Sequence, residues 1–418
     1  MPRRILALLT VVALVSLAAC RRGGGERIGQ TPTPLPTSAV TGGATATPAP
    51  VPEAYRALYE ELEGQLTKAG ERFEALPQAT RPALAIELLP ANGNRGPDLL
   101  QPGALEGVRL YLDAAVALGA RGVNLSIVYP LFGEREPHRE EYIGFYREVI
   151  AQCRQRGLAV SVEMGPAFAG TQSSSLRVDY TGLTPQAYLD ERLRQAALAA
   201  HALEPDYLTL AEEQDTERML TGLDLRTDDY VAMLRSARVE IDPPPGVLLG
   251  AGSGSWEAPD LVQRVIAETD LDFVNIHVYP LTNGIVDYLG RAAEWAAQAR
   301  AAGKRAIIGE TWLYKASVED LRAGLSFADV YARDQFSFWA PLDALHVRTM
   351  RTLAAGAGVE YVSFFWSAFL FAYIDYEAAS GRSGGELTRL ANAAAVQAIL
   401  ERRLSASGEA FRRAAAAK

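Results

Sequence analysis

Eight short apolar runs, separated by amphipathic stretches with helical periodicity, constrain the fold of this 418-residue chain more than any other feature. The runs are Ala83–Pro90, Gly122–Leu131, Leu158–Phe168, Tyr207–Ala211, Val247–Gly252, Phe273–Leu281, Arg305–Trp312 and Tyr361–Leu370. Strands that alternate with helices are joined by crossovers and lie parallel in one sheet. Eight such units close into a (β/α)8 barrel, an α/β fold. An open doubly wound sheet is the alternative, but residues 88–93 lack its glycine fingerprint for phosphate.

Local signals predict where several helices begin and end. Residues 53–76 show helical periodicity without a strand signal, so we expect one helix before the first strand. The pairing of a Ser or Thr with a following Pro or acid is typical of a helix start, as at Thr184-Pro185 and Thr227-Asp228-Asp229. Glycines that follow a helix and precede a strand are typical of helix ends, as at Gly119, Gly157 and Gly303.

The N-terminal twenty residues are typical of an export signal. Arg3 and Arg4 precede an uncharged apolar run, Ile5–Ala19, which is too short to span a bilayer comfortably. The run ends in Leu-Ala-Ala-Cys20, which resembles the bacterial lipobox, in which the cysteine is lipidated. This resemblance implies a signal peptide over 1–19 and a lipid anchor at Cys20, hence a membrane-anchored, extracytoplasmic protein. An ordinary secretory signal is the alternative.

Composition separates the remaining chain into a linker and one domain. Residues 20–52 are rich in Thr, Pro, Gly and Ala and poor in large apolar residues, which predicts a disordered linker. Residues 53–418 then form a single barrel domain with its N-terminal helix. The net charge of −9 argues against nucleic acid as a partner. Cys153 lies on an apolar helical face and is interpreted as a buried structural thiol.

Polar and aromatic residues gather at the carboxyl ends of the runs, where a barrel of this kind holds its active site. Isolated carboxylates are costly there unless they are paired or used. The candidates, in chain order, are Glu87, Glu163, Glu212, Glu213, Trp256, His277, Tyr279, Glu310, Trp312 and Trp366.

In their order along the strands, several of these residues resemble the site of clan A retaining glycoside hydrolases. Those barrels carry an acid/base Glu after the fourth strand, a His-x-Tyr pair on the sixth, a nucleophilic Glu on the seventh and a Trp on the eighth. Glu213, His277-Val278-Tyr279, Glu310 and Trp366 stand in those places. The run Gly309-Glu310-Thr311 is similar to the nucleophile strand of endo-β-1,4-galactanases.

The resemblance implies a retaining β-glycosidase acting on a polysaccharide or oligosaccharide, with Glu310 as nucleophile and Glu213 as acid/base. Glu212 is the alternative acid. Glu87, Glu163, Glu212, His277 and Tyr279 are then expected to bind substrate, with Trp256, Trp312 and Trp366 stacking on sugar rings. The resemblance also implies a non-proline cis peptide between Trp366 and Ser367, and no cofactor.

Two other functions fit the same residues. A metal-dependent sugar isomerase-like barrel would use Glu87, Glu163, Glu212 and His277 as ligands. A catalytically silent, lipid-anchored carbohydrate-binding barrel would keep the aromatic residues without a close glutamate pair. The distance between the carboxyl groups of Glu213 and Glu310 distinguishes the glycosidase from the binding barrel. The sequence does not indicate the oligomeric state.

Overall fold

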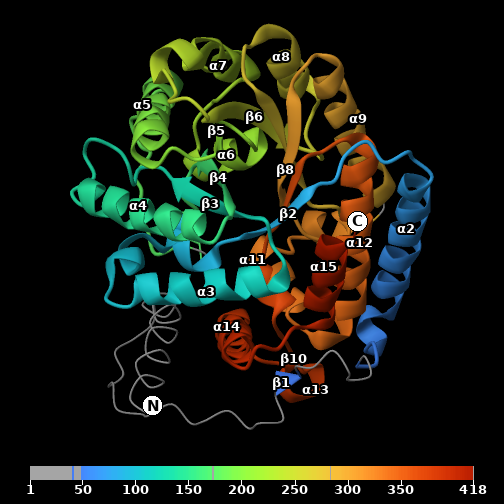
Figure 1. The fold of residues 1–418 in the computed structure, drawn as a ribbon. Coiled ribbons are helices and arrows are strands. Elements are labelled where there is room, and N and C mark those ends of the chain that lie inside the picture. Colours follow the sequence, from blue (N-terminus) through green and yellow to red (C-terminus); the bar gives the residue numbers. More distant parts are fainter. Residues whose placement is uncertain (1–39, 42–48, 172–173, 283, 418) are drawn as a thin grey trace.

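The computed structural model describes residues 40–41, 49–171, 174–282 and 284–417, and its centre is a closed barrel of eight parallel strands (Figure 1). The strands, in chain order, are β2 (Ala83–Glu87), β3 (Gly122–Val128), β4 (Ala159–Gly165), β5 (Tyr207–Thr209), β6 (Leu248–Gly254), β7 (Phe273–Val278), β8 (Arg305–Thr311) and β9 (Tyr361–Phe364). Each strand pairs with its neighbours in sequence, and β9 pairs with β2 to close the barrel. The (β/α)8 prediction is confirmed.

One helix of the outer ring follows each barrel strand. These helices are α3 (Ala104–Leu118), α4 (Arg139–Gln155), α5 (Pro185–Leu203), α7 (Thr227–Ile241), α8 (Asp260–Glu268), α9 (Ile285–Ala301), α12 (Ala340–Ala357) and α14 (Gly384–Leu400). The N-terminal helix predicted over 53–76 is present as η3 (Glu53–Tyr55) and α2 (Arg56–Glu74), which packs beside α12 and α9 (Figure 1). The C-terminal helix α15 (Ala406–Ala416) packs against α12.

Shorter elements fill the connections. The helices are α6 (Gln214–Thr221), α10 (Val318–Arg322), α11 (Phe327–Asp334) and α13 (Tyr376–Ala379). The 3-10 turns are η4 (Leu89–Ala91), η5 (Gly93–Leu100), η6 (Ser337–Trp339) and η7 (Ser367–Leu370). Two of the short helices, α10 and α11, belong to the long connection between β8 and α12.

Large side chains fill the amino-terminal end of the barrel because glycines leave room for them. Ala85, Phe273, Ile307 and Tyr361 form a buried cluster there. A Cβ on Gly250 would lie 2.3 Å from the Phe273 ring. The floor of the barrel is therefore packed side chains, and chemistry is confined to the opposite end.

The predicted helix signals are confirmed at most positions. The hydroxyl of Thr184 accepts a hydrogen bond from the Ala187 amide and caps α5. Gly119, Gly157 and Gly303 all adopt the left-handed conformation, with φ of 91°, 68° and 78°. The expected cap at Thr227 is wrong by one residue, because Arg226 occupies the N-cap position of α7.

The structure describes only part of the N-terminal predictions. The signal peptide over 1–19 and Cys20 lie outside the described residues. Within the predicted linker, the structure describes β1 (Val40–Thr41), which pairs antiparallel with β10 (Tyr373–Ile374). Over the part of the chain that the structure describes, no helix combines the length and apolar character needed to cross a bilayer. Cys153 is fully buried, as predicted.

Candidate active site

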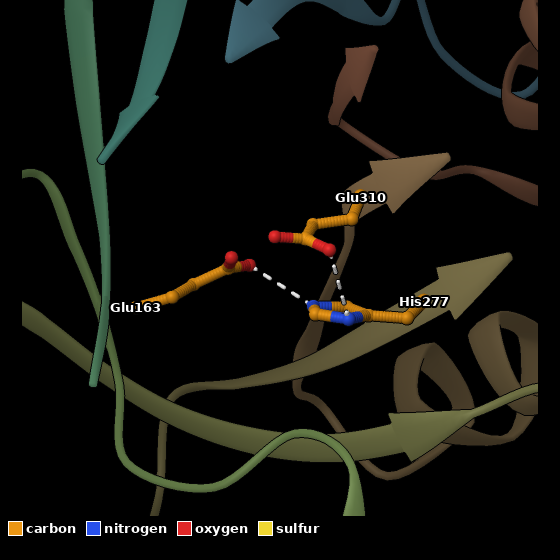
Figure 2. A group of neighbouring side chains, drawn as sticks. All are labelled: Glu163, His277 and Glu310. Atoms are coloured by element: carbon orange, nitrogen blue, oxygen red, sulfur yellow. Dashed lines mark hydrogen bonds and ion pairs between the residues drawn. The ribbon is translucent and has the colours of Figure 1, made fainter. Parts of the chain in front are cut away.

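Three side chains from three strands meet at the carboxyl end of the barrel (Figure 2). Glu163 comes from β4, His277 from β7 and Glu310 from β8. The imidazole lies between the two carboxyl groups. Its Nε2 is 3.1 Å from Glu163 Oε1, and its Nδ1 is 3.6 Å from Glu310 Oε2. The barrel mouth therefore holds a buried imidazole flanked by acids, as the strand-end pattern predicts.

Glu213 reaches the same imidazole nitrogen from a different connection. It lies between β5 and α6, and its Oε1 is 2.9 Å from His277 Nδ1. Because Glu310 Oε2 contacts this nitrogen too, the Glu213 and Glu310 oxygens lie no more than about 6.5 Å apart, the sum of the two distances. The structure thus brings together the two glutamates that the sequence pairs.

A tyrosine hydroxyl fixes the Glu310 carboxyl group. Tyr279, just after β7, donates a hydrogen bond of 2.7 Å to Glu310 Oε2. Burial raises the pKa of Glu310 well above its usual range, and the charges of Glu163 and Glu213 act in the same direction. The imidazole of His277 and the Tyr279 hydroxyl oppose this rise. These two groups are thus what stabilises a carboxylate at Glu310.

Glu163 lies beneath this pair as an ionised carboxylate. It accepts hydrogen bonds from Asn124 Nδ2 at 2.6 Å and Asn275 Nδ2 at 2.8 Å, besides its contact with His277. Burial alone would raise the pKa of Glu163, but the imidazole and the two amides hold it below the usual value. With 2% of its surface exposed, Glu163 supports His277 and does not face the mouth as a substrate ligand would.

His277 carries the proton that balances these acids. Burial alone would lower its pKa, but the carboxylates of Glu163 and Glu310 raise it well above the ordinary value. Both ring nitrogens already contact carboxylate oxygens, at 2.9 Å and 3.1 Å. A metal ligand must offer an unprotonated nitrogen. Glu163, His277 and Glu310 could hold a divalent cation only after losing that proton.

The ligand set of the alternative, isomerase-like barrel does not come together among the described residues, because Glu87 and Glu212 are not grouped with Glu163 and His277. Glu87, at the end of β2, accepts hydrogen bonds from Asn92 Nδ2 at 3.0 Å and from the Trp366 amide at 3.1 Å. Burial raises the pKa of Glu87 to about 7. This carboxyl group therefore holds the turn after β9, and the expectation that it binds substrate or metal has no support in the geometry.

Glu212 differs sharply from its neighbour Glu213. Its Oε1 packs over Gly165, where a Cβ would lie only 2.6 Å away, and its Oε2 has no hydrogen-bonding partner among the described residues. Burial raises the pKa of Glu212 well above its usual range, against the charge of Arg192. Glu212 is thus a half-buried acid beside the site with a buried Oε2, whereas Glu213 contacts His277.

Aromatic side chains form an arc beside Glu310. Successive ring centroids are 6.0 Å apart for Trp256 and Tyr279, 5.0 Å for Tyr279 and Tyr314, 5.3 Å for Tyr314 and Trp366, and 4.7 Å for Trp366 and Tyr331. Trp256 and Trp366 are half-buried, so part of each ring is open to a ligand. Sequence reasoning missed Tyr314 and Tyr331, because the connection after β8 carries no motif that places them.

Two sequence expectations about tryptophan are wrong. Trp312 is fully buried, packs on Phe369 and lies under the Lys315 ammonium group, so it cannot stack on a ligand. Trp312 comes just after the last residue of β8, Thr311, and tertiary packing rather than strand alternation places its ring in the interior. The expected cis peptide after Trp366 is absent, because the cis bond among the described residues is Tyr129–Pro130. Trp366 instead turns the chain in the left-handed conformation, with φ of 47°.

Fold and site together define a (β/α)8 barrel with an imidazole-bridged carboxyl pair and an aromatic arc at the carboxyl end of its strands. No family model and no curated protein matches this sequence. Among solved structures, an exo-β-1,4-mannosidase from Opitutaceae bacterium strain TAV5 is similar at 16% identity and a TM-score of 0.52, over 81% of this chain and 59% of that one. This chain thus spans less than two thirds of the mannosidase chain.

Other similar structures carry related names. An endo-β-1,4-mannanase from Cellulomonas fimi is 13% identical, with a TM-score of 0.45, over 80% of this chain and 74% of that one. A fungal β-1,4-galactanase is 12% identical, with a TM-score of 0.38, over 67% of this chain and 90% of that one. The structures similar to this barrel are thus clan A glycoside hydrolases, as the sequence resemblance predicted. At these identities the likeness shows the shared barrel fold.

Proposed function

We propose that this protein is a retaining β-glycosidase that cleaves a polysaccharide or oligosaccharide by double displacement, with Glu310 as nucleophile and Glu213 as acid/base. The observation that carries the proposal is the convergence of both carboxyl groups on His277 Nδ1, at 2.9 Å and 3.6 Å. Retaining enzymes need carboxyl groups about 5–5.5 Å apart, whereas inverting enzymes need about 6.5–9.5 Å. Those two contacts keep one oxygen of each carboxyl group within about 6.5 Å of the other, which is compatible with the retaining geometry.

Glu310 attacks the anomeric carbon in its ionised form, which His277 and the Tyr279 hydroxyl favour against the effect of burial on its pKa. Its carboxyl group is 12% exposed at the mouth, and one oxygen is held by the Tyr279 hydroxyl at 2.7 Å. That hydrogen bond leaves Oε1 to form the ester with the sugar. Once the ester forms, Glu310 loses its charge, and the hydroxyl remains in place to stabilise the carboxylate when the ester is hydrolysed.

The proton for the leaving group is available through Glu213. His277 has a raised pKa, so a proton resides on the ring within one hydrogen bond of Glu213 Oε1. Glu213 passes a proton to the glycosidic oxygen in the first step and removes one from water in the second. Glu163 keeps this arrangement aligned, because its contact with Nε2 fixes the ring orientation.

The aromatic arc supports a carbohydrate substrate. Half-buried Trp256 and Trp366 offer flat apolar faces near the carboxyl pair. The C–H faces of pyranose rings stack on such surfaces, while their hydroxyl groups face polar side chains. In this proposal the sugar at the cleavage point lies against the arc, with its anomeric carbon between Glu310 and Glu213.

The proposed location is the outer side of a bacterial membrane, held by a lipid on Cys20. It is supported by the arginines at the start of the chain, the apolar run and the Leu-Ala-Ala-Cys20 sequence. A Thr- and Pro-rich linker then separates the anchor from the barrel, which lets the mouth reach an extended polymer.

The decisive test uses the full chain with Cys20→Ala, so that it can be purified without lipid. It is incubated with 2,4-dinitrophenyl β-glycosides of glucose, mannose, galactose and xylose and with a panel of polysaccharides. Proton NMR of the first product should show the β-anomer. A 2-deoxy-2-fluoro glycoside should label the peptide that contains Glu310, and Glu310→Gln should remove the label. Saturable polysaccharide binding without any turnover would replace this proposal with the silent binding barrel.

A further inference from the structure

Glu213 stands at the start of α6, where a carboxyl side chain would ordinarily accept hydrogen bonds from the first N–H groups of the helix. It is the N-cap residue of α6, yet its side chain makes no cap hydrogen bond. The first N–H groups of a helix lack partners within the helix and attract negative charge. The Glu213 carboxyl group instead turns away from α6 to His277 Nδ1. Another group must therefore satisfy the first turn of α6.

Glu257 supplies that group from the neighbouring connection, which follows β6. Its Oε1 accepts a hydrogen bond of 2.6 Å from the Asp215 amide in the first turn of α6. The Glu257 side chain is 4% exposed, so water does not compete effectively for this contact. A carboxyl group distant in sequence, whose pKa burial raises to about 7, thus caps the helix in place of Glu213.

The second oxygen of Glu257 holds the turn from which it projects. Oε2 accepts hydrogen bonds from Ser253 Oγ at 2.6 Å and from the Gly254 amide at 2.8 Å. From outside the turn, Arg291 Nη1 donates to the Ser255 and Glu257 carbonyl oxygens, at 2.8 Å and 3.0 Å. Contacts that do not involve α6 therefore hold the Glu257 carboxyl group in place.

The other two acidic residues at the start of α6, Asp215 and Glu217, have partners of their own. Asp215 pairs with Arg218 one turn later. Glu217 is buried and receives hydrogen bonds from Tyr188, Tyr230 and Arg192. Of the carboxyl groups that begin or belong to α6, Glu213 alone therefore faces the mouth.

We propose that Glu257 is a positioning residue for the acid/base: it caps α6 and thereby keeps the Glu213 carboxyl group directed at His277 and the barrel mouth. Without Glu257, the Asp215 amide loses its acceptor, and the Glu213 side chain folds back onto the first turn of α6. This inference rests on the proposed function for its kinetic consequence, but the position of Glu213 can be tested without any substrate.

The kinetic test compares leaving groups in the full chain carrying Glu257→Ala. A polysaccharide or alkyl glycoside, whose leaving group needs protonation, should be cleaved about 10–100-fold more slowly, part of the effect of general acid catalysis. The matching 2,4-dinitrophenyl glycoside, which needs little protonation, should change by no more than about threefold. A merely structural role would slow both substrates equally.

Matched variants separate capping from general destabilisation. Glu257→Gln keeps the side-chain shape but turns its amide toward one of the donors, so its effect should lie between wild type and Glu257→Ala. Asp375→Ala removes another carboxylate cap, the one on the Ala378 amide of α13. It should lower stability without any dependence on the leaving group.

A crystal structure of Glu257→Ala tests the position of the Glu213 carboxyl group without any measurement of enzyme activity. We expect the Glu213 carboxyl group to leave His277 and accept a hydrogen bond from an amide in the first turn of α6. If Glu213 stays on His277 and both substrates respond alike, the inference fails while the glycosidase remains. If Glu213 moves but the wild-type chain cleaves no glycoside, the positioning role stands and the proposed function fails.

Discussion

Gly309→Ala tests the core of the site with a single methyl group. Gly309 precedes Glu310 on β8, and its amide donates a hydrogen bond of 2.8 Å to Asn275 Oδ1. An alanine Cβ would lie 2.0 Å from Glu163 Oε1, 2.5 Å from Asn275 Oδ1 and 2.6 Å from Asn275 Nδ2. These side chains cannot move aside freely, because both are buried and Asn275 Nδ2 donates a hydrogen bond of 2.8 Å to Glu163 Oε1.

The expected cost has two parts. Forcing a methyl group into a packed interior costs about 1–3 kcal/mol. Displacing Glu163 breaks a hydrogen bond to a buried charge, which costs about 1.5–3 kcal/mol. Gly309→Ala should therefore lower the free energy of unfolding by about 2.5–6 kcal/mol. It should also reduce turnover, because Glu163 holds the ring of His277.

Urea unfolding followed by tryptophan fluorescence measures the first effect. The transition midpoint should fall while its slope stays constant. Gly144→Ala is the matched control, because it adds the same methyl group within α4 where no atom lies within 4 Å. It should raise the stability by about 0.5–1 kcal/mol. Equal midpoints for Gly309→Ala and wild type would show that Glu163 does not lie against β8.

Three further predictions concern other parts of the chain. Glu213→Ala should slow cleavage of the natural substrate about 10²–10⁴-fold. Azide should rescue the turnover of an activated aryl glycoside by this variant and give a β-configured product. A variant within a few-fold of wild type contradicts the assignment and makes Glu212→Ala the next test. Burial lowers the pKa of His346 to about 3, so between that value and its ordinary 6.5 the unfolded state binds the extra proton and stability falls with falling pH. His346→Gln should therefore flatten the profile over about pH 4–6 by up to about 1.4 kcal/mol per unit, and an unchanged slope would refute the burial argument. Cys20→Ala should release the protein from the membrane fraction, whereas a soluble wild type with intact Cys20 would reject the lipid anchor.

The strand pattern predicts much of the site because a barrel brings all strand ends to one face. Glu163, Glu213, His277, Tyr279 and Glu310 are distant in sequence, yet each follows from asking which residue ends a strand. The same reasoning does not predict how deeply each side chain is buried below the barrel mouth. Glu163 and Glu310 both stand near strand ends, but one is buried beneath the imidazole and the other is open at the mouth.

Pattern reasoning also fails where a contact joins two connections. Glu257 lies in a loop without a motif, and nothing in the sequence predicts that it caps α6. Trp312 stands close to Glu310 in the chain, but packing places its ring in the interior. Glu87 ends a strand, as a substrate ligand would, but binds the Trp366 amide.

The sequence by itself determined the strand count, the parallel order and the end of the barrel that carries the acids, since hydrophobic periodicity and chain direction are local properties. Tertiary structure alone decided which carboxyl groups share the His277 proton, which acid caps a helix and which aromatic rings stay open. These outcomes depend on distances of a few ångströms between segments far apart in the chain. Burial and neighbouring charge, which set each protonation state, exist only once the barrel has closed.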